Sequence, residues 1–144
     1  INAYYSQIKE NNFNRSILRT AVEEYVTNPE HARSKYGPIE LWDVSNVTYM
    51  EGIFRGYVEF DEDIGGWDVS KVTNMTLMFY ECHNFNQNIG GWDVSNVTNM
   101  EQMFRACVKF NQDISRWDVS KILINEMFDG CNILDEYKPK FNNG

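Results

Sequence analysis

Aspartate and serine recur together in the chain as part of a tetrapeptide, Trp-Asp-Val-Ser. The tetrapeptide occupies residues 42–45, 67–70, 92–95 and 117–120. A serine acts as a nucleophile only when a base lies within hydrogen-bonding reach, and an acid then orients that base. The chain has two histidines, His31 and His83, and neither recurs with the tetrapeptide. A catalytic triad cannot be assembled from these spacings, so we expect no enzymatic activity and no catalytic residue.

The cysteines also recur at one place in successive repeats. They are Cys82, Cys107 and Cys131, separated by 25 and 24 residues. Metal-ligand pairs have much shorter spacings, and stacked helices would hold these residues too far apart for disulfides. We therefore predict buried free thiols that pack as small apolar side chains, with no metal site and no cofactor.

The tetrapeptide belongs to a longer repeat. Apolar residues that follow Ile64 recur 25 residues later, from Ile89 onward. Four units follow one another, the first from Ile39 and the fourth, one residue shorter, from Ile114. One such unit cannot bury its apolar face alone, whereas stacked units can. The period therefore predicts a stack of four repeats.

Within a unit the apolar spacing changes. Trp67 and Val69 are two residues apart, which is typical of a strand, whereas from Val72 the spacing of three is typical of a helix. Thr98 and Glu101, like the equivalent pair of the first unit, match a capping box at a helix start. Stacked helices need more room than stacked strands. We therefore predict the α/β class, with a curved β/α solenoid that has short parallel strands on its concave side and short helices on its convex side.

The first 38 residues do not follow the repeat. Apolar residues between Ile17 and Val26 share one helical face, and Asn28-Pro29 matches the start of a second helix that runs to about Tyr36. We expect a helical N-terminal cap that closes the first coil.

This pattern divides the chain into three parts. The expected boundaries are a cap at 1–38, a four-coil solenoid at 39–135 and a tail at 136–144. The tail has no matching cap, so either Tyr137 and Phe141 fold over the last coil or a partner covers it.

The run WDVSNVTNMEQMFRACVKFNQDISRWDVS, residues 92–120, resembles the BspA-like leucine-rich-repeat surface proteins. The resemblance covers about residues 39–135 and implies a solenoid of the leucine-rich-repeat kind. It also implies surface display, with protein or host-matrix binding for some bacterial members. A cell-surface or extracellular location is favoured by this resemblance alone.

The net charge of −8 is confined to the repeats. Residues 1–41 hold five basic and five acidic residues, whereas residues 42–144 hold eight basic and 16 acidic ones. An acidic surface repels nucleic acid phosphates and anionic lipid. The sequence also lacks a run of about 18 apolar residues, and its N-terminal stretch has neither a basic start nor an apolar core. We expect no nucleic acid partner, no membrane insertion and no signal peptide.

Alternation along the expected strand separates core from surface. It points Trp42, Trp67, Trp92 and Trp117 into the core as a ladder, although an exposed row that stacks carbohydrate or bases is an alternative. The predicted binding ladder lies on the opposite, concave face and comprises Asp43, Asp68, Asp93, Asp118, Ser45, Ser70, Ser95 and Ser120.

The aspartates of this ladder would lie about 5 Å apart, where like charges repel by roughly 1 kcal/mol even in water. Hydrogen bonds from serine or threonine of the same corner, a cationic partner or bound Ca²⁺ could offset the repulsion. Calcium takes about six to eight oxygens, more than one row of carboxylates supplies.

The leading hypothesis is therefore a non-enzymatic protein-interaction or adhesion-type module. Its acidic concave face would bind a basic protein surface or a surface or matrix component. The alternative is a structural spacer or assembly subunit that associates end to end through its C-terminal coil.

Overall fold

Two α-helices open the described part of the chain, which comprises residues 13–122 and 126–141 of a computed structural model. The first helix, α2 (Arg15–Thr27), begins where the Asn14 side chain accepts a hydrogen bond from the Ile17 N–H. The second, α3 (Pro29–Tyr36), has Asn28 as its N-cap and ends at Gly37, whose φ is 80°. Both helices begin and end close to the positions that the sequence predicts.

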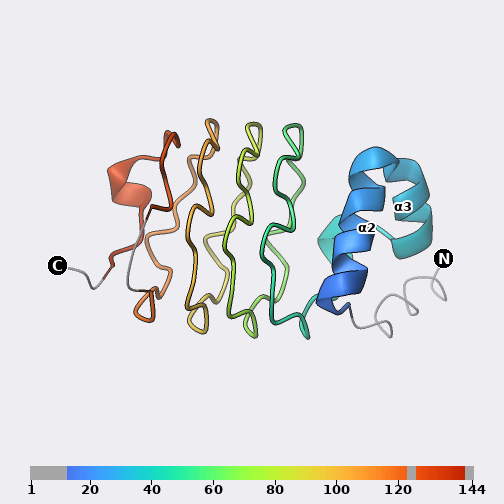
Figure 1. The fold of residues 1–144 in the computed structure, drawn as a ribbon, viewed down its shortest axis with the longest axis horizontal. Helices are drawn as coiled ribbons and strands as arrows, with labels where there is room; N and C mark the ends of the chain where they lie inside the picture. Colours follow the sequence, from blue (N-terminus) through green and yellow to red (C-terminus); the bar gives the residue numbers. More distant parts are fainter. Residues whose placement is uncertain (1–12, 123–125, 142–144) are drawn as a thin grey trace.

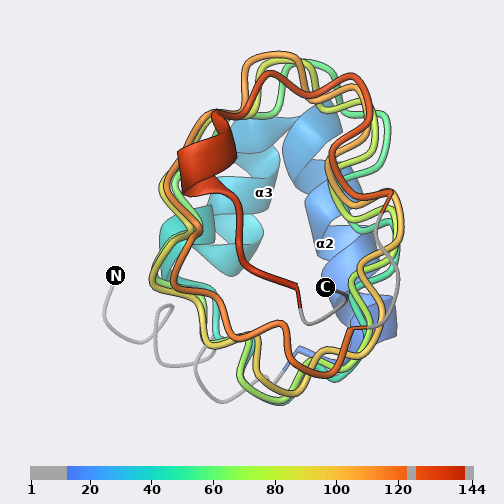
Figure 2. The same ribbon diagram turned by 90° about the vertical axis from the view of Figure 1, so that its left-hand side faces the viewer.

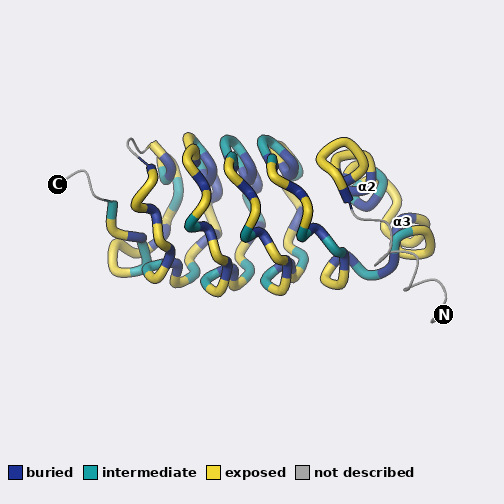
Figure 3. Tube along the Cα trace, turned by 90° about the horizontal axis from the view of Figure 1, so that it is seen from below, coloured by how far each residue is buried: buried dark blue, intermediate teal, exposed yellow. Residues whose placement is uncertain are grey.

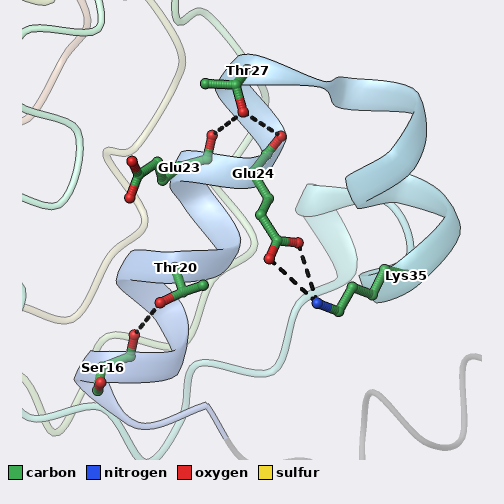
Figure 4. Close-up of polar contacts among 6 residues, drawn as sticks. All are labelled: Ser16, Thr20, Glu23, Glu24, Thr27 and Lys35. Carbon is green, nitrogen blue, oxygen red and sulfur yellow. Dashed lines mark hydrogen bonds and ion pairs between the residues drawn. The ribbon is translucent and has the colours of Figure 1, made fainter.

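An exposed ion pair joins the two helices, since Lys35 Nζ of α3 lies 3.3 Å from Glu24 Oε1 of α2 (Figure 4). Within α2, the Thr27 hydroxyl donates a hydrogen bond to the Glu23 carbonyl at 2.8 Å. The inner side of α2 packs on the first coil through its buried residues Leu18, Ala21, Val22 and Tyr25. Neither helix is long and apolar enough to cross a bilayer, and no other described segment offers such a helix.

The repeats form a stack of coils beside these helices (Figure 1). A short 3₁₀ helix, η1 (Ile39–Leu41), leads into the first coil. Viewed along the stack, the coils lie over one another around one closed outline (Figure 2). Equivalent residues of neighbouring coils are hydrogen bonded, since the Thr73 N–H donates to the Thr48 carbonyl at 2.8 Å and the Thr98 N–H to the Thr73 carbonyl at 2.9 Å.

The segment expected to be helical is instead a run of turns. Every second N–H in it donates to the next coil: Gly52 to Thr76 O at 2.9 Å, and Phe54 to Met78 O at 3.0 Å. A helix needs those N–H groups for carbonyls four residues back in its own segment. The expected capping box is also absent, because the Thr98 hydroxyl donates to the Thr73 carbonyl of the preceding coil at 3.2 Å. The predicted repeat helices are therefore wrong.

The predicted strands are wrong as well. Across residues 13–122 and 126–141 no strand or sheet is present, and the β pairing is confined to isolated parallel bridges, Tyr49 to Asn74 and Asn74 to Asn99. The α/β class, the β/α solenoid of leucine-rich-repeat type and its concave strand face are thus corrected. The hydrogen bonds between coils run along the turn segment, and positive φ at positions such as Gly52 and Gly56 keeps that segment out of the extended conformation of a strand.

The core runs along the axis of the stack. Buried and exposed residues alternate along each coil (Figure 3). Phenylalanine rings of successive coils stack, with centroids 5.4 Å apart for Phe54 and Phe79 and 5.5 Å apart for Phe79 and Phe104. A single unit of 25 residues cannot bury a core of its own, so these contacts between units form the core.

The C-terminal segment lies against the last coil. A 3₁₀ helix, η2 (Asp135–Tyr137), precedes it, and the Tyr137 carbonyl accepts a hydrogen bond from the Ile114 N–H at 3.0 Å. Tyr137 and Phe141 pack against the core, which is the first of the two alternatives for the tail. Residues 1–12, where the sequence predicts no signal peptide, and residues 142–144 of the tail lie outside the described residues.

Candidate functional site

The tryptophans lie in the core. Trp42, Trp67, Trp92 and Trp117 are only 3–4 % exposed. Each indole N–H donates to a carbonyl nearer the N-terminus, such as Trp92 Nε1 to Ile64 O at 3.1 Å. The rings of Trp92 and Trp117 are stacked, with centroids 6.3 Å apart. The indoles connect neighbouring coils, and their faces are not exposed to a carbohydrate or a base.

The aspartates of the tetrapeptide lie in register along one corner of the stack. We call Asp43, Asp68, Asp93 and Asp118 the aspartate row. Each is hydrogen bonded to the serine two residues later, which belongs to the set Ser45, Ser70, Ser95 and Ser120. Asp68 Oδ1 accepts from both the Ser70 N–H at 3.0 Å and the Ser70 hydroxyl at 2.6 Å. The serine of the same corner is thus the partner, as in the first of the three alternatives.

Hydrogen bonding favours the ionised form of Asp68, Asp93 and Asp118, since it lowers the pKa of each. The Ser70 hydroxyl and N–H lower the pKa of Asp68, and the equivalent bonds from Ser120 lower the pKa of Asp118. The pKa of Asp93 is also lowered, chiefly by Ser95, although the neighbouring charges of the row oppose this shift. No hydrogen bond to the second oxygen, Oδ2, of any row member occurs in the described structure. That oxygen remains available to a partner.

Lysines moderate the charge of the row at two places. Lys71 reaches Asn46 Oδ1 at 3.0 Å and lowers the pKa of Asp68, and Lys121 plays the same part near Asp118. The equivalent residue in the third coil is Asn96, so Asp93 has no lysine at this position. The negative potential of the row is therefore expected to be greatest around Asp93.

The serine hydroxyls of the first three repeats donate to aspartate. Of the two histidines, His31 lies in α3 and His83 in a turn after Cys82. Within the described residues, no group of three or more His, Cys, Asp and Glu side chains could hold a metal ion.

Two of the three recurring thiols are buried as the spacing predicts, whereas the third, Cys131, is free but only partly buried. Cys82 and Cys107 are buried and free, and each donates to a phenylalanine carbonyl of the preceding coil, such as Cys82 Sγ to Phe54 O at 2.9 Å. Burial raises the pKa of Cys82 to about 12. Such thiols are poor nucleophiles at neutral pH.

Two hollows at the ends of the turn run were missed by sequence reasoning. A cavity of about 270 Å³ lies between α2 and the first coils, lined in part by Arg15, Arg19 and Glu51. Another, of about 510 Å³, lies beside the last coil and is lined in part by Phe128 and Asp129. Their existence depends on where the stack of coils ends, which residue spacing alone does not reveal.

Comparison with known proteins places the repeats in a wider group. A family model described as "Mycoplasma protein of unknown function, DUF285" matches residues 20–141. This range includes α3 and all the coils. No curated protein and no solved structure matches the chain.

Proposed function

The chain belongs to the DUF285 family, and from this premise we propose that it is a non-enzymatic binding module whose aspartate row binds a cationic protein surface. The observation that carries the proposal is the register of four carboxylates along one corner, each with Oδ2 unoccupied by any described hydrogen bond. A partner with regularly spaced lysine or arginine side chains would complement this arrangement.

The resemblance to BspA-like surface proteins supports the same proposal. It favours display at the cell surface and a protein or matrix partner. It does not extend to the leucine-rich-repeat architecture, which the coils do not have.

The aspartates also accept hydrogen bonds at the corner of each coil. A test of their charge therefore needs a variant that removes the charge but keeps these hydrogen bonds. Asparagine meets this need, because Asn88 Oδ1 already accepts from the Gly90 N–H at 3.0 Å in the same geometry. We would therefore change Asp68, Asp93 and Asp118 together to Asn and measure binding of a fluorescent deca-lysine peptide. We expect the affinity to fall about tenfold, and the binding of the unaltered chain to weaken as salt rises.

A matched control removes the same charge from another corner. Asp61, Asp63 and Asp113 changed together to Asn lose three charges, at positions where other coils have Asn86 and Asn88. An equal loss of affinity in both variants, or salt-independent binding, would show that the row has no role of its own.

The assembly-subunit hypothesis has less support. Tyr137 and Phe141 pack on the last coil and leave less of that end for stacking against another copy. Sedimentation at two concentrations separates the two proposals, since a spacer that assembles end to end gains mass with concentration.

A further inference from the structure

The hydrogen bonds that join the turn segments of neighbouring coils end at the last coil. In the third coil the Phe104 N–H donates to Met127 O at 3.0 Å, and the Ala106 N–H donates to Asp129 O at 2.8 Å. The equivalent donors of the last coil are the N–H groups of Glu126, Phe128 and Gly130. None of these three has a hydrogen-bond partner in the described structure.

These donors keep the geometry of the coils before them. Gly130 has φ of 71°, close to the 60° of Ala106, which it follows in register. Successive donors are two residues apart, as they are at Gly52, Phe54 and Gly56 of the first coil. Unpaired N–H groups at this spacing form an edge to which an extended segment adds through its carbonyls.

The side chains of Phe128 and Asp129, beside the donors, are more exposed than those of Phe104 and Arg105 in the preceding coil. Phe128 stacks on Phe104 at 5.7 Å but is only half-buried, whereas Phe104 is fully buried. Its ring is approached by Lys138 Nζ, 5.5 Å from the centroid. Asp129 pairs with Arg105 of the coil below at 3.5 Å, and its side chain remains 69 % exposed.

We propose that the edge formed by residues 126–130 binds an extended peptide segment of a partner protein. The carbonyls of this segment would accept hydrogen bonds from the three free N–H groups. The segment would place an apolar side chain over Phe128, in place of the Lys138 ammonium, and a basic side chain over Asp129. The hollow of about 510 Å³ beside these residues provides room for it.

The chemistry of the segment follows from the coils themselves. Residues at the position of Asp129 interact in pairs between neighbouring coils. The Arg55 guanidinium lies 5.2 Å from the centroid of the Tyr80 ring, and Arg105 forms an ion pair with Asp129. A basic residue is the complement of Asp129. The preceding position is Phe54 in the first coil and Phe104 in the third, so an aromatic–basic pair is the expected motif.

A second copy of the chain cannot supply the carbonyls in the described arrangement. The matching acceptors would be the carbonyls of Glu51, Ile53 and Arg55, which have no described partner. They border the cavity that Arg15 and Arg19 of α2 also line, and α2 occupies the position of a preceding coil (Figure 1). This proposal concerns a different surface from the aspartate row and does not rest on the proposed function.

The test uses a synthetic peptide with the sequence of residues 99–106, NMEQMFRA, and the full chain. Peptide binding is followed by fluorescence anisotropy, and amide hydrogen exchange is followed by NMR at Glu126, Phe128 and Gly130. In the free chain we expect Phe128 and Gly130 to exchange at least about 100-fold faster than Phe104 and Ala106. Saturating peptide should slow all three edge amides by about tenfold or more.

A charge exchange tests the position of the basic side chain. Asp129→Arg should weaken peptide binding about fivefold, which corresponds to a loss of about 1 kcal/mol. A peptide with Asp in place of its Arg should recover that affinity on the Asp129→Arg variant. Glu40→Arg, an equal charge change at the far end of the stack, should leave binding unchanged.

Three results would overturn the proposal. They are no binding of the peptide at millimolar concentration, equally tight binding of a scrambled peptide, and binding that leaves the edge amides unprotected. Protection of these amides by raising the concentration of the chain alone would assign the edge to a second copy and contradict the assignment to a partner peptide.

Discussion

The helical end and the coil stack satisfy their backbone groups in opposite ways. In α2, the Leu18 N–H finds the Asn14 carbonyl at 2.9 Å, four residues back. In the stack, the Phe79 N–H finds the Met103 carbonyl, also at 2.9 Å, 24 residues ahead. The bonds are equally short, but one kind closes within a segment and the other only between repeats. The helices are thus specified locally, whereas each coil is completed by its neighbours.

The largest effect should come from breaking a contact that joins coils. Trp92→Ala removes a side chain that is 4 % exposed and its bond to the Ile64 carbonyl. We expect the free energy of unfolding to fall by about 3–5 kcal/mol in chemical denaturation. Gly91→Ala is the control, because a Cβ there would meet nothing within 4 Å. Unchanged stability of Trp92→Ala would contradict its core position.

A smaller effect should distinguish a bond between coils from a bond within the helices. Asn86 Oδ1 accepts from the Asn111 N–H at 2.9 Å and from Gln112 Nε2 at 3.0 Å. Asn86→Ala should cost about 1–2 kcal/mol, while Asn86→Asp should cost little, because Asp61 fills this role one coil earlier.

The matching change in the helices is Asn28→Ala, which removes the N-cap of α3 and should cost about 1 kcal/mol. Thermal unfolding monitored by circular dichroism compares the two. The comparison fails if Asn86→Asp is as damaging as Asn86→Ala.

One substitution should have opposite signs in the two regions. Ala106 adopts φ of 60°, which strains an alanine but not a glycine. Ala106→Gly should therefore raise the free energy of unfolding by about 0.5–1 kcal/mol. Ala21→Gly in α2 should lower it by at least about 1 kcal/mol, since glycine disfavours helix. Equal signs in urea titrations would contradict the difference in backbone conformation.

The smallest expected effect is the response of the stack to acid. Folding lowers the pKa of Asp68, Asp93 and Asp118 from the ordinary value of 3.8. The stability that these carboxylates contribute is therefore complete above that value and is lost as pH falls through the lower folded-state pKa values. Unfolding midpoints between pH 5 and about pH 2.5 should decline less in the triple Asp→Asn variant. A parallel decline in both proteins would contradict this assignment.

The helices could be predicted from sequence because their signals are local. Asn28-Pro29 marks one start, and Gly37 marks the end. The prediction of helices in the repeats was wrong because a spacing of three between apolar residues also fits successive turns. Gly52 and Gly56, both with positive φ, lie inside the segment expected to be helical. Glycine at two positions of a supposed helix was the available signal against it.

The candidate site was only partly predictable. The pairing of each aspartate with its serine was one of three alternatives, because the two residues are neighbours in sequence. The edge at Glu126, Phe128 and Gly130 carries no signal of its own, since the N–H groups equivalent to those of Phe128 and Gly130 are paired in every earlier coil. Only the arrangement of the coils in the structure shows that no further coil lies beside these donors.

The direction of the bonds between coils also has a mechanical consequence. They run along the long axis of the molecule, parallel to a pull applied between its two ends (Figure 1). Such a force would load one coil interface at a time, and each interface would open by peeling. The chain would then lengthen in steps of about one repeat, behaving as an extensible tether whose increments are set by its 25-residue period.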